Sequence, residues 1–262
     1  LRLMRYLLLI ILLSCLSSVS LANPLIRKSS VVEYQYHIVA SYPHSTEIFT
    51  QGLEYRRGLL YESAGQRSQS RVTKRSLNAA KPIKTTPLLQ RYFGEGLSLL
   101  NNQLFQLTWQ SGRGFIYHPD TLKKIGDFPI DGEGWGLTND GQNLIVSNGS
   151  SQISFVDPEK FSIVRTLHVT IDGIPVPKIN ELEWVDGVIY ANIWQSDWIV
   201  MIDSQSGDVV GKVFLKNLLP DELKSYKTDV LNGIAFDHQE QRLLVTGKYW
   251  PRIYHIELTA IK

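Results

Sequence analysis

A short motif that recurs five times is the feature that most constrains how this chain can fold. In each copy a polar residue or a tryptophan is followed by Gly-Leu, Gly-Ile or Leu. A turn and a strand that alternates between apolar and polar residues come next. The glycines at 52, 96 and 136 lie 44 and 40 residues apart, which is the length of a four-stranded propeller blade. We therefore predict an all-β, five-bladed β-propeller. The five copies begin at Gln51, Glu95, Trp135, Glu181 and Asn232.

The two ends of the repeat region are predicted to close the ring together. Val32–Val39 and Arg252–Leu258 both alternate like strands, and a propeller must pair its last open edges. We expect both strands in one blade. Two insertions that contain prolines, 168–179 and 217–230, are predicted loops, with one helical turn within 218–226. The segment 66–91 has seven basic residues and no acidic one, and we expect it to be a solvated outer edge of the first blade.

The N-terminal 22 residues have the pattern of a secretory signal peptide. Arg2 and Arg5 precede the apolar run Leu7–Leu13, which is too short to span a bilayer, and small residues end the segment at Ala22. We predict a signal peptide at residues 1–22, a catalytic propeller domain at 31–260 and a secreted or periplasmic protein with no transmembrane segment after cleavage. Lipid anchoring through Cys15, the only cysteine, is the alternative.

The composition and net charge of the chain limit the classes of binding partner to be expected. Without residues 1–22, which hold two arginines and no acid, 25 basic and 25 acidic residues remain. A net charge of zero argues against a protein that binds nucleic acid or a membrane surface. The six histidines have no metal-ligand spacing. We expect no catalytic metal and no required cofactor, and we leave open a structural cation in the channel.

The repeat starts would form a ring at one mouth of the central channel, where propellers usually carry their function. The residues at and beside the repeat starts include both aromatic and polar side chains. The aromatic residues are equally well explained as packing between blades, whereas buried polar groups need partners. Glu95 stands between Gly94 and Gly96, so its carboxylate should be poorly solvated and its pKa raised, which suits acid–base catalysis.

Eight motifs in this order resemble the plant and bacterial glutaminyl-peptide cyclotransferase family, known from papaya latex. They extend over nearly all of the chain after residue 31. One departure is Asn148, where that family usually has Asp. The motifs are Phe49–Leu53 (FTQGL), Tyr92–Leu97 (YFGEGL), Leu107–Trp109 (LTW), Asp131–Leu137 (DGEGWGL), Ile179–Trp184 (INELEW), Ala191–Asp197 (ANIWQSD), Asp229–Ala235 (DVLNGIA) and Thr246–Pro251 (TGKYWP).

This resemblance implies a five-bladed propeller that converts the N-terminal glutamine of peptides to pyroglutamate and releases ammonia. By resemblance, Glu95 shuttles the proton while Lys248 and Asn180 stabilise the developing charge. The substrate partners are peptides or proteins that begin with Gln, and we expect a monomer. The residues expected to bind substrate are Phe49, Gln51, Phe93, Trp109, Trp135 and Trp194.

Two other readings fit the residues. A five-bladed glycosidase would use Glu95 with Glu133 or Glu181 as its carboxylate pair, and aromatic walls also suit sugars. A non-catalytic binding propeller would keep the aromatic pocket without depending on Glu95. The lysine Lys248 and the ring of amides distinguish the cyclotransferase, because a glycosidase does not require them.

Overall fold

The computed structural model describes residues 31–261, so the predicted signal peptide at 1–22 lies outside the described residues. The described chain is all-β, as predicted, and its one helix is the 3₁₀ turn η1 (Asp221–Leu223), inside the segment predicted to hold a helical turn. No helix of the described part is long and apolar enough to cross a membrane. The strands are β1 (Val32–Pro43), β2 (Thr50–Arg56), β3 (Leu59–Ala64), β4 (Arg71–Ser76), β5 (Lys84–Pro87), β6 (Gly94–Leu100), β7 (Gln103–Thr108), β8 (Arg113–Tyr117), β9 (Lys124–Pro129), β10 (Leu137–Asn139), β11 (Leu144–Ser147), β12 (Gln152–Val156), β13 (Ile163–His168), β14 (Thr170–Ile171), β15 (Ile174–Pro175), β16 (Ile179–Val185), β17 (Val188–Ile193), β18 (Trp198–Asp203), β19 (Val209–Phe214), β20 (Leu231–Asp237), β21 (Arg242–Gly247) and β22 (Arg252–Ala260).

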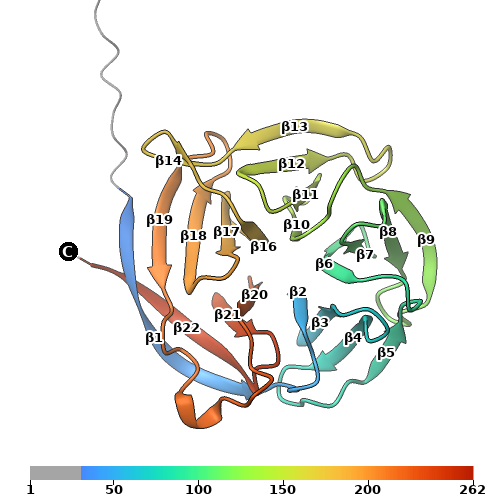
Figure 1. Ribbon diagram of the computed structural model, residues 1–262, viewed down its shortest axis with the longest axis horizontal. Helices are drawn as coiled ribbons and strands as arrows, with labels where there is room; N and C mark the ends of the chain where they lie inside the picture. The colour runs from blue at the N-terminus through green and yellow to red at the C-terminus, as the bar shows by residue number, and fades with distance from the viewer. Residues whose placement is uncertain (1–30, 262) are drawn as a thin grey trace, which may run out of the picture.

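The strands form sheets arranged around a common centre (Figure 1). Within residues 31–261, three sheets have four strands each, β2-β3-β4-β5, β6-β7-β8-β9 and β10-β11-β12-β13, and one has eight, in the order β16-β17-β18-β19-β1-β22-β21-β20. The strands nearest the centre contact one another in the cyclic order β2, β6, β10, β16, β20. The predicted loop 168–179 is not wholly irregular, because β14 and β15 form a small hairpin in it.

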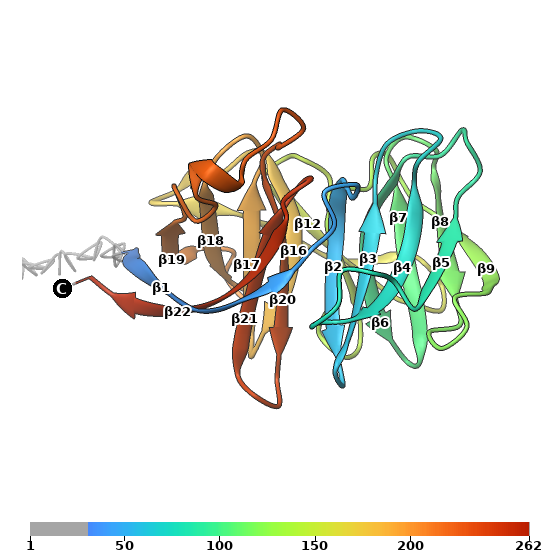
Figure 2. The ribbon, with the colours of Figure 1, turned by 90° about the horizontal axis from the view of Figure 1, so that it is seen from below.

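The first and last strands pair, as their alternating patterns predicted. β1 runs antiparallel to β22, from Tyr34 opposite Ala260 to Pro43 opposite Arg252. Its other edge pairs in parallel with β19, beginning at Val32 opposite Gly211. β1 therefore joins the four strands β16–β19 to the three strands β20–β22 and completes the eight-stranded sheet. Figure 2 shows β1 and β22 running side by side toward the outside of the ring.

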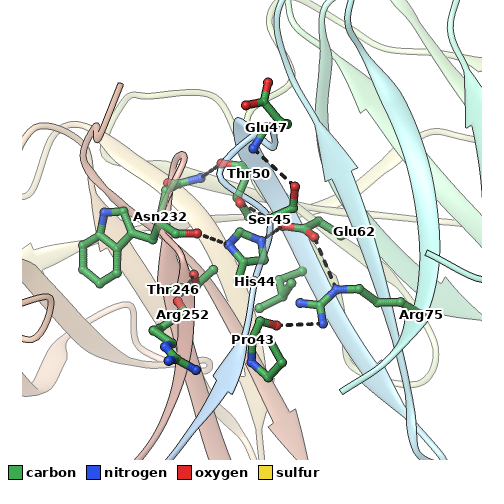
Figure 3. A network of polar contacts seen from close by, with 12 residues as sticks. Pro43, His44, Ser45, Glu47, Thr50, Glu62, Arg75, Asn232, Thr246 and Arg252 are labelled. Carbon is green, nitrogen blue, oxygen red and sulfur yellow. Dashed lines mark hydrogen bonds and ion pairs between the residues drawn. The ribbon is translucent and has the colours of Figure 1, made fainter. Parts of the chain in front are cut away.

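A buried charge network fastens this closure to the first sheet (Figure 3). His44 Nδ1 lies 2.6 Å from the Trp250 carbonyl oxygen, and its Nε2 lies 2.8 Å from Glu62 Oε1. The Thr50 hydroxyl also donates to Glu62 Oε1, at 2.8 Å. Arg75 Nε lies 3.9 Å from Glu62 Oε2. Burial raises the pKa of Glu62, but His44, Arg75 and Thr50 outweigh it and hold the pKa below its ordinary value.

This network corrects the expectation that 66–91 is a solvated edge. Arg75 is 0% exposed and Lys74 is 8% exposed. The Lys74 ammonium donates to the Pro119 carbonyl oxygen at 3.2 Å, so it bridges to the next sheet. Lys81 and Lys84 are exposed, as expected. Charge composition alone did not separate the buried pair from the exposed one, because the difference lies in strand position: Lys74 and Arg75 lie on β4, which β5 covers, whereas Lys81 precedes the outermost strand β5 and Lys84 begins it.

Glycines let the innermost strands approach one another backbone to backbone. A Cβ on Gly52 would lie 2.4 Å from the Leu97 nitrogen, and one on Gly136 would lie 2.0 Å from the Asn180 oxygen. The Gly96 N–H donates to the Trp135 carbonyl oxygen at 2.7 Å, across two sheets. The recurrent glycine of the sequence motif is therefore required by the closeness of neighbouring sheets, since no side chain fits there.

We expect Gly136→Ala to lower the free energy of unfolding by about 1–3 kcal/mol, because overpacking forces backbone shifts. Gly126→Ala is the matched control, since a Cβ there meets nothing closer than Ile116 Cδ1 at 3.4 Å. Urea unfolding of both variants measures the difference. Equal stability of the two variants would contradict the close-approach argument.

We expect Glu62→Gln to lower the free energy of unfolding by about 3–5 kcal/mol, because it leaves Arg75 and His44 buried without their anion. Asp221→Asn breaks the exposed pair with Lys224 and should change stability immeasurably. Thermal and urea unfolding test both variants. A Glu62→Gln protein as stable as wild type would show that the network does not hold the closure.

Candidate active site

Irregularities at the starts of four innermost strands position three predicted site residues and Asn232. Pairing with the neighbouring strand slips at these points, so the strand bulges and its side chains are re-aimed. The slips lie between Thr50 and Gly52, Gly94 and Leu97, Ile179 and Leu182, and Leu231 and Ile234. They enclose Gln51, Glu95, Asn180 and Asn232, which the structure thereby brings to one end of the ring centre.

A chain of hydrogen bonds links these four polar side chains. The Asn180 amide donates to Asn232 Oδ1 at 2.9 Å. The Asn232 amide donates to the Thr50 carbonyl oxygen at 2.9 Å and approaches Gln51 Oε1 at 3.4 Å. The Gln51 amide donates to Glu95 Oε2 at 2.7 Å. All four are buried, so they form a fixed polar floor in which each group is oriented by the next.

Glu95 is the titratable group of this floor. Glu95 is 4% exposed. Burial raises its pKa well above the ordinary 4.5, nearby Glu133 raises it further, and Lys248 and the Gln51 hydrogen bond oppose the shift. A carboxyl group with a raised pKa can both accept and return a proton near neutral pH. The side chain therefore has the chemistry of a general acid–base.

Lys248 brings a cation to the same place. It directly follows β21, and its backbone pairs with Asp229 and Val230. The Nζ atom lies 4.4 Å from the centre of the Phe49 ring. Burial lowers its pKa, while Glu95 and Asp229 counteract this. Among the described residues the structure gives Nζ no hydrogen-bonding side chain or carbonyl, so its donors are available to a ligand.

Aromatic rings form a wall above the polar floor. The predicted aromatic residues are half-buried, in contrast to the buried polar groups. Phe49 contacts Phe93 at 6.0 Å between ring centres, and Phe93 contacts Trp109 at 5.7 Å. Trp135 contacts Trp194 edge to face at 5.5 Å. Such a wall excludes water on one side while leaving the site accessible.

The turn at Asn148 shapes this wall. Asn148 Oδ1 accepts a hydrogen bond from the Ser150 backbone N–H at 3.1 Å. Gly149 lies so close to the Trp135 indole that a Cβ would meet the ring at 2.7 Å. The residue that departs from the family pattern is thus a turn former beside the wall.

Glu133 and Asn232 also contribute, although the sequence analysis gave them no role in a cyclotransferase: Asn232 was only a repeat start, and Glu133 belonged to the alternative glycosidase pair. Glu133 Oε2 accepts hydrogen bonds from the indole nitrogens of Trp109, at 2.8 Å, and of Trp135, at 2.9 Å. Asn232 links Asn180 to Gln51, as described above. The signal for Asn232 was its repeat position, shared with Gln51 and Glu95. No sequence signal indicates that one carboxylate joins two tryptophans.

The other carboxylate considered for a sugar-cleaving pair has a different task. Glu181 is 0% exposed, and its two oxygens accept hydrogen bonds from the Leu53 and Ile234 backbone N–H groups at 3.1 and 2.8 Å. It therefore holds three innermost strands together. No group of three or more His, Cys, Asp or Glu side chains within residues 31–261 is placed to hold a metal ion.

A hollow of about 410 Å³ opens at the opposite end of the innermost strands, where Glu54 and Glu183 line it. It contains none of the residues of the polar floor. Its lining includes no lysine, whereas a carboxyl group, a lysine and side-chain amides converge at the Glu95 end. Chemistry, and not cavity size, identifies the candidate site.

Comparison with known proteins agrees with this arrangement. The family model described as glutamine cyclotransferase matches residues 7–258. The chain is 40% identical over 228 residues to a curated glutaminyl-peptide cyclotransferase from Arabidopsis thaliana, covering 86% of this chain and 71% of the relative. The crystal structure of Myxococcus xanthus glutaminyl cyclase superposes with a TM-score of 0.82 at 36% identity, over 88% of this chain and 100% of that one. This chain belongs to the glutamine cyclotransferase family.

Proposed function

We propose that this protein is a glutaminyl-peptide cyclotransferase that converts the N-terminal glutamine of peptides to pyroglutamate and releases ammonia. The plant relative carries this name, and the family match extends over nearly the whole chain. The observation that carries the assignment is the buried Glu95, hydrogen-bonded to Gln51 and influenced by Lys248. An acid–base group, an amide and a cation meet there beneath an aromatic wall.

The reaction requires that the α-amine be held against the γ-amide carbon and that one group carry a proton from the attacking nitrogen to the leaving nitrogen. The neutral α-amine attacks the γ-amide carbon, and a new C–N bond closes the five-membered ring. Because both groups belong to one residue, holding a reactive conformer supplies much of the acceleration. Ionised Glu95 accepts a proton from the attacking nitrogen and gives it to the amide nitrogen. The C–N bond to that nitrogen then breaks, ammonia leaves and Glu95 is again ionised.

The other floor residues supply orientation and charge. Gln51 holds the Glu95 carboxyl through its 2.7 Å hydrogen bond. Lys248 has free donors, and Asn180 has one amide hydrogen beyond the one given to Asn232. These two groups bind the γ-amide oxygen as it becomes negative; the loss of one such donor typically costs about 2.7–4 kcal/mol of barrier. No step requires a metal or cofactor.

The aromatic side chains enclose the reacting residue. Phe49, Phe93 and Trp109 follow one another around the wall, and Trp135 and Trp194 continue it. Their faces suit the methylene chain of glutamine, and their bulk excludes water that would compete for the carboxyl. We assign all five to substrate binding, together with Gln51.

The sheets are best read as five blades. The eight-stranded sheet would be two blades of four strands, with β1 as the outer strand next to β22 and a parallel contact to β19. The cyclic contacts of five innermost strands support this count. We further propose that residues 1–22 are a secretory leader, that the enzyme acts as a monomer outside the cytoplasm, and that Cys15 is an alternative site of lipid attachment.

Incubation of the purified protein with a Gln-initiated dipeptide should release one ammonia per peptide. In Glu95→Gln we expect kcat to fall about 10²–10⁴-fold, because the proton shuttle is lost. Glu47→Gln, which removes an exposed carboxylate paired with Lys227, is the control with unchanged activity. Ammonia release and mass spectrometry of the product measure both. Cleavage of aryl glycosides, or peptide binding without ammonia release, would overturn the assignment.

The pH profile of kcat should be bell-shaped. Its acid limb should lie above the pH at which an ordinary glutamate titrates, and its alkaline limb below the pH at which an ordinary lysine titrates. Glu95 must be ionised to accept the proton, and burial raises its pKa, so activity should fall already above pH 4.5 as the pH decreases. Lys248 must stay charged, and burial lowers its pKa, so the alkaline limb should lie below the ordinary lysine range. Steady-state kinetics across the pH range measures both limbs. An acid limb at the pH of an ordinary glutamate would contradict the role of Glu95.

A further inference from the structure

Glu133 occupies a break in the aromatic wall. Ring contacts run from Phe49 through Phe93 to Trp109, and separately from Trp135 to Trp194. Between Trp109 and Trp135 the described structure has a carboxylate in place of a ring contact. Glu133 Oε2 accepts both indole N–H groups, at 2.8 and 2.9 Å. A single oxygen atom therefore sets the position of two wall residues.

The carboxylate is also kept ionised. The Gln110 side-chain amide donates to Glu133 Oε1 at 2.7 Å. Together with the Trp135 and Trp109 hydrogen bonds it holds the pKa of Glu133 below its ordinary value, although partial burial opposes this. Glu133 is half-buried, whereas Glu95 is buried. The negative charge of Glu133 thus lies nearer to solvent than the proposed acid–base group, Glu95.

The substrate arrives with a charge of the opposite sign. A free peptide α-amine has a pKa of about 7.7–8.0, so most molecules carry an ammonium group at neutral pH. Lys248 has the wrong sign to receive it. Burial raises the pKa of Glu95, and its carboxylate is needed for the proton shuttle. Among the charged groups that influence Glu95, which are Lys248 and Glu133, only Glu133 is a lasting anion.

We propose that Glu133 is the recognition residue for the cationic N-terminus of the peptide, and that it fixes the positions of Trp109 and Trp135 through their indole N–H groups. The inference rests on the proposed cyclotransferase function. Glu133 exchanges no proton in the reaction. It pairs with the ammonium group on entry, and the ammonium group gives its proton to solvent water before attack, so that Glu95 is still ionised when the neutral amine attacks.

Glu133→Gln separates the charge from the geometry. The amide oxygen of Gln can still accept both indole N–H groups, and the exposed Gln110 side chain can turn to water. We expect KM for a Gln-initiated dipeptide to rise about tenfold or more at low ionic strength, the effect of losing one charge-assisted hydrogen bond, while kcat stays within about twofold. The dependence of kcat/KM on salt should flatten, since screening acts on the lost charge.

Two further readouts distinguish recognition from a structural role. Because the charge of Glu133 raises the pKa of Glu95, the acid limb of kcat should move to lower pH in Glu133→Gln. A competitor that is the same dipeptide without its α-amino group should bind wild type more weakly than the substrate does. Glu133→Gln should remove that preference for the amine.

Matched variants complete the experiment. Asp131→Asn removes an exposed carboxylate two residues away and should leave KM and its salt dependence unchanged. Glu133→Asp keeps the charge and should retain the salt dependence even if the wall shifts. An unchanged KM in Glu133→Gln, or a loss of kcat with wild-type salt dependence, would overturn the recognition role. Wild-type protein that releases no ammonia would instead overturn the proposed function itself.

Discussion

The innermost strand of each sheet has an edge with no strand beside it, and the N–H groups on that edge must find other acceptors. Buried backbone donors without partners are costly. Here acidic side chains of neighbouring sheets supply the acceptors: Glu181 binds Leu53 and Ile234, Glu183 binds Phe236, and Glu54 binds Leu99. Their burial raises their pKa, that of Glu54 to about 7. The centre of the ring is polar because the fold requires it.

The candidate site uses the same polar centre differently. Glu181 and Glu95 both lie where strand pairing slips, but their hydrogen-bond partners differ. Glu181 accepts backbone N–H groups with both oxygens, whereas Glu95 accepts a hydrogen bond from a side chain, that of Gln51. At the same slips the side-chain amides of Asn180, Asn232 and Gln51 orient one another. The partner, and not the slip itself, therefore separates the structural carboxylate Glu181 from the candidate acid–base Glu95. Both carry a raised pKa for the same reason, which is loss of hydration.

The sequence predicted much of this because its repeat has a physical cause. The recurring glycine is needed where innermost strands nearly touch, and so its spacing marks four of the five innermost strands and the residue beside each glycine. Alternation identified β1 and β22 as partners. The sequence could not show that Arg75 is buried or that Glu133 joins two tryptophans, because both depend on contacts between residues in different sheets or on side-chain direction. The predicted roles of Glu95, Lys248 and Asn180 stay predictions, now with a geometry that supports them.

The pairing of β1 with β19 and β22 imposes an order of events on the newly made chain. β1 is synthesised first, yet both of its partners come from the last quarter of the protein. Gln51 and Lys248 are brought together by the same closure, through the bond from the Tyr249 N–H to the Ile48 carbonyl oxygen. Contacts between such distant segments form late and slowly. The nascent chain therefore lacks the closed candidate site, and keeps unprotected strand edges, until β22 has emerged from the ribosome.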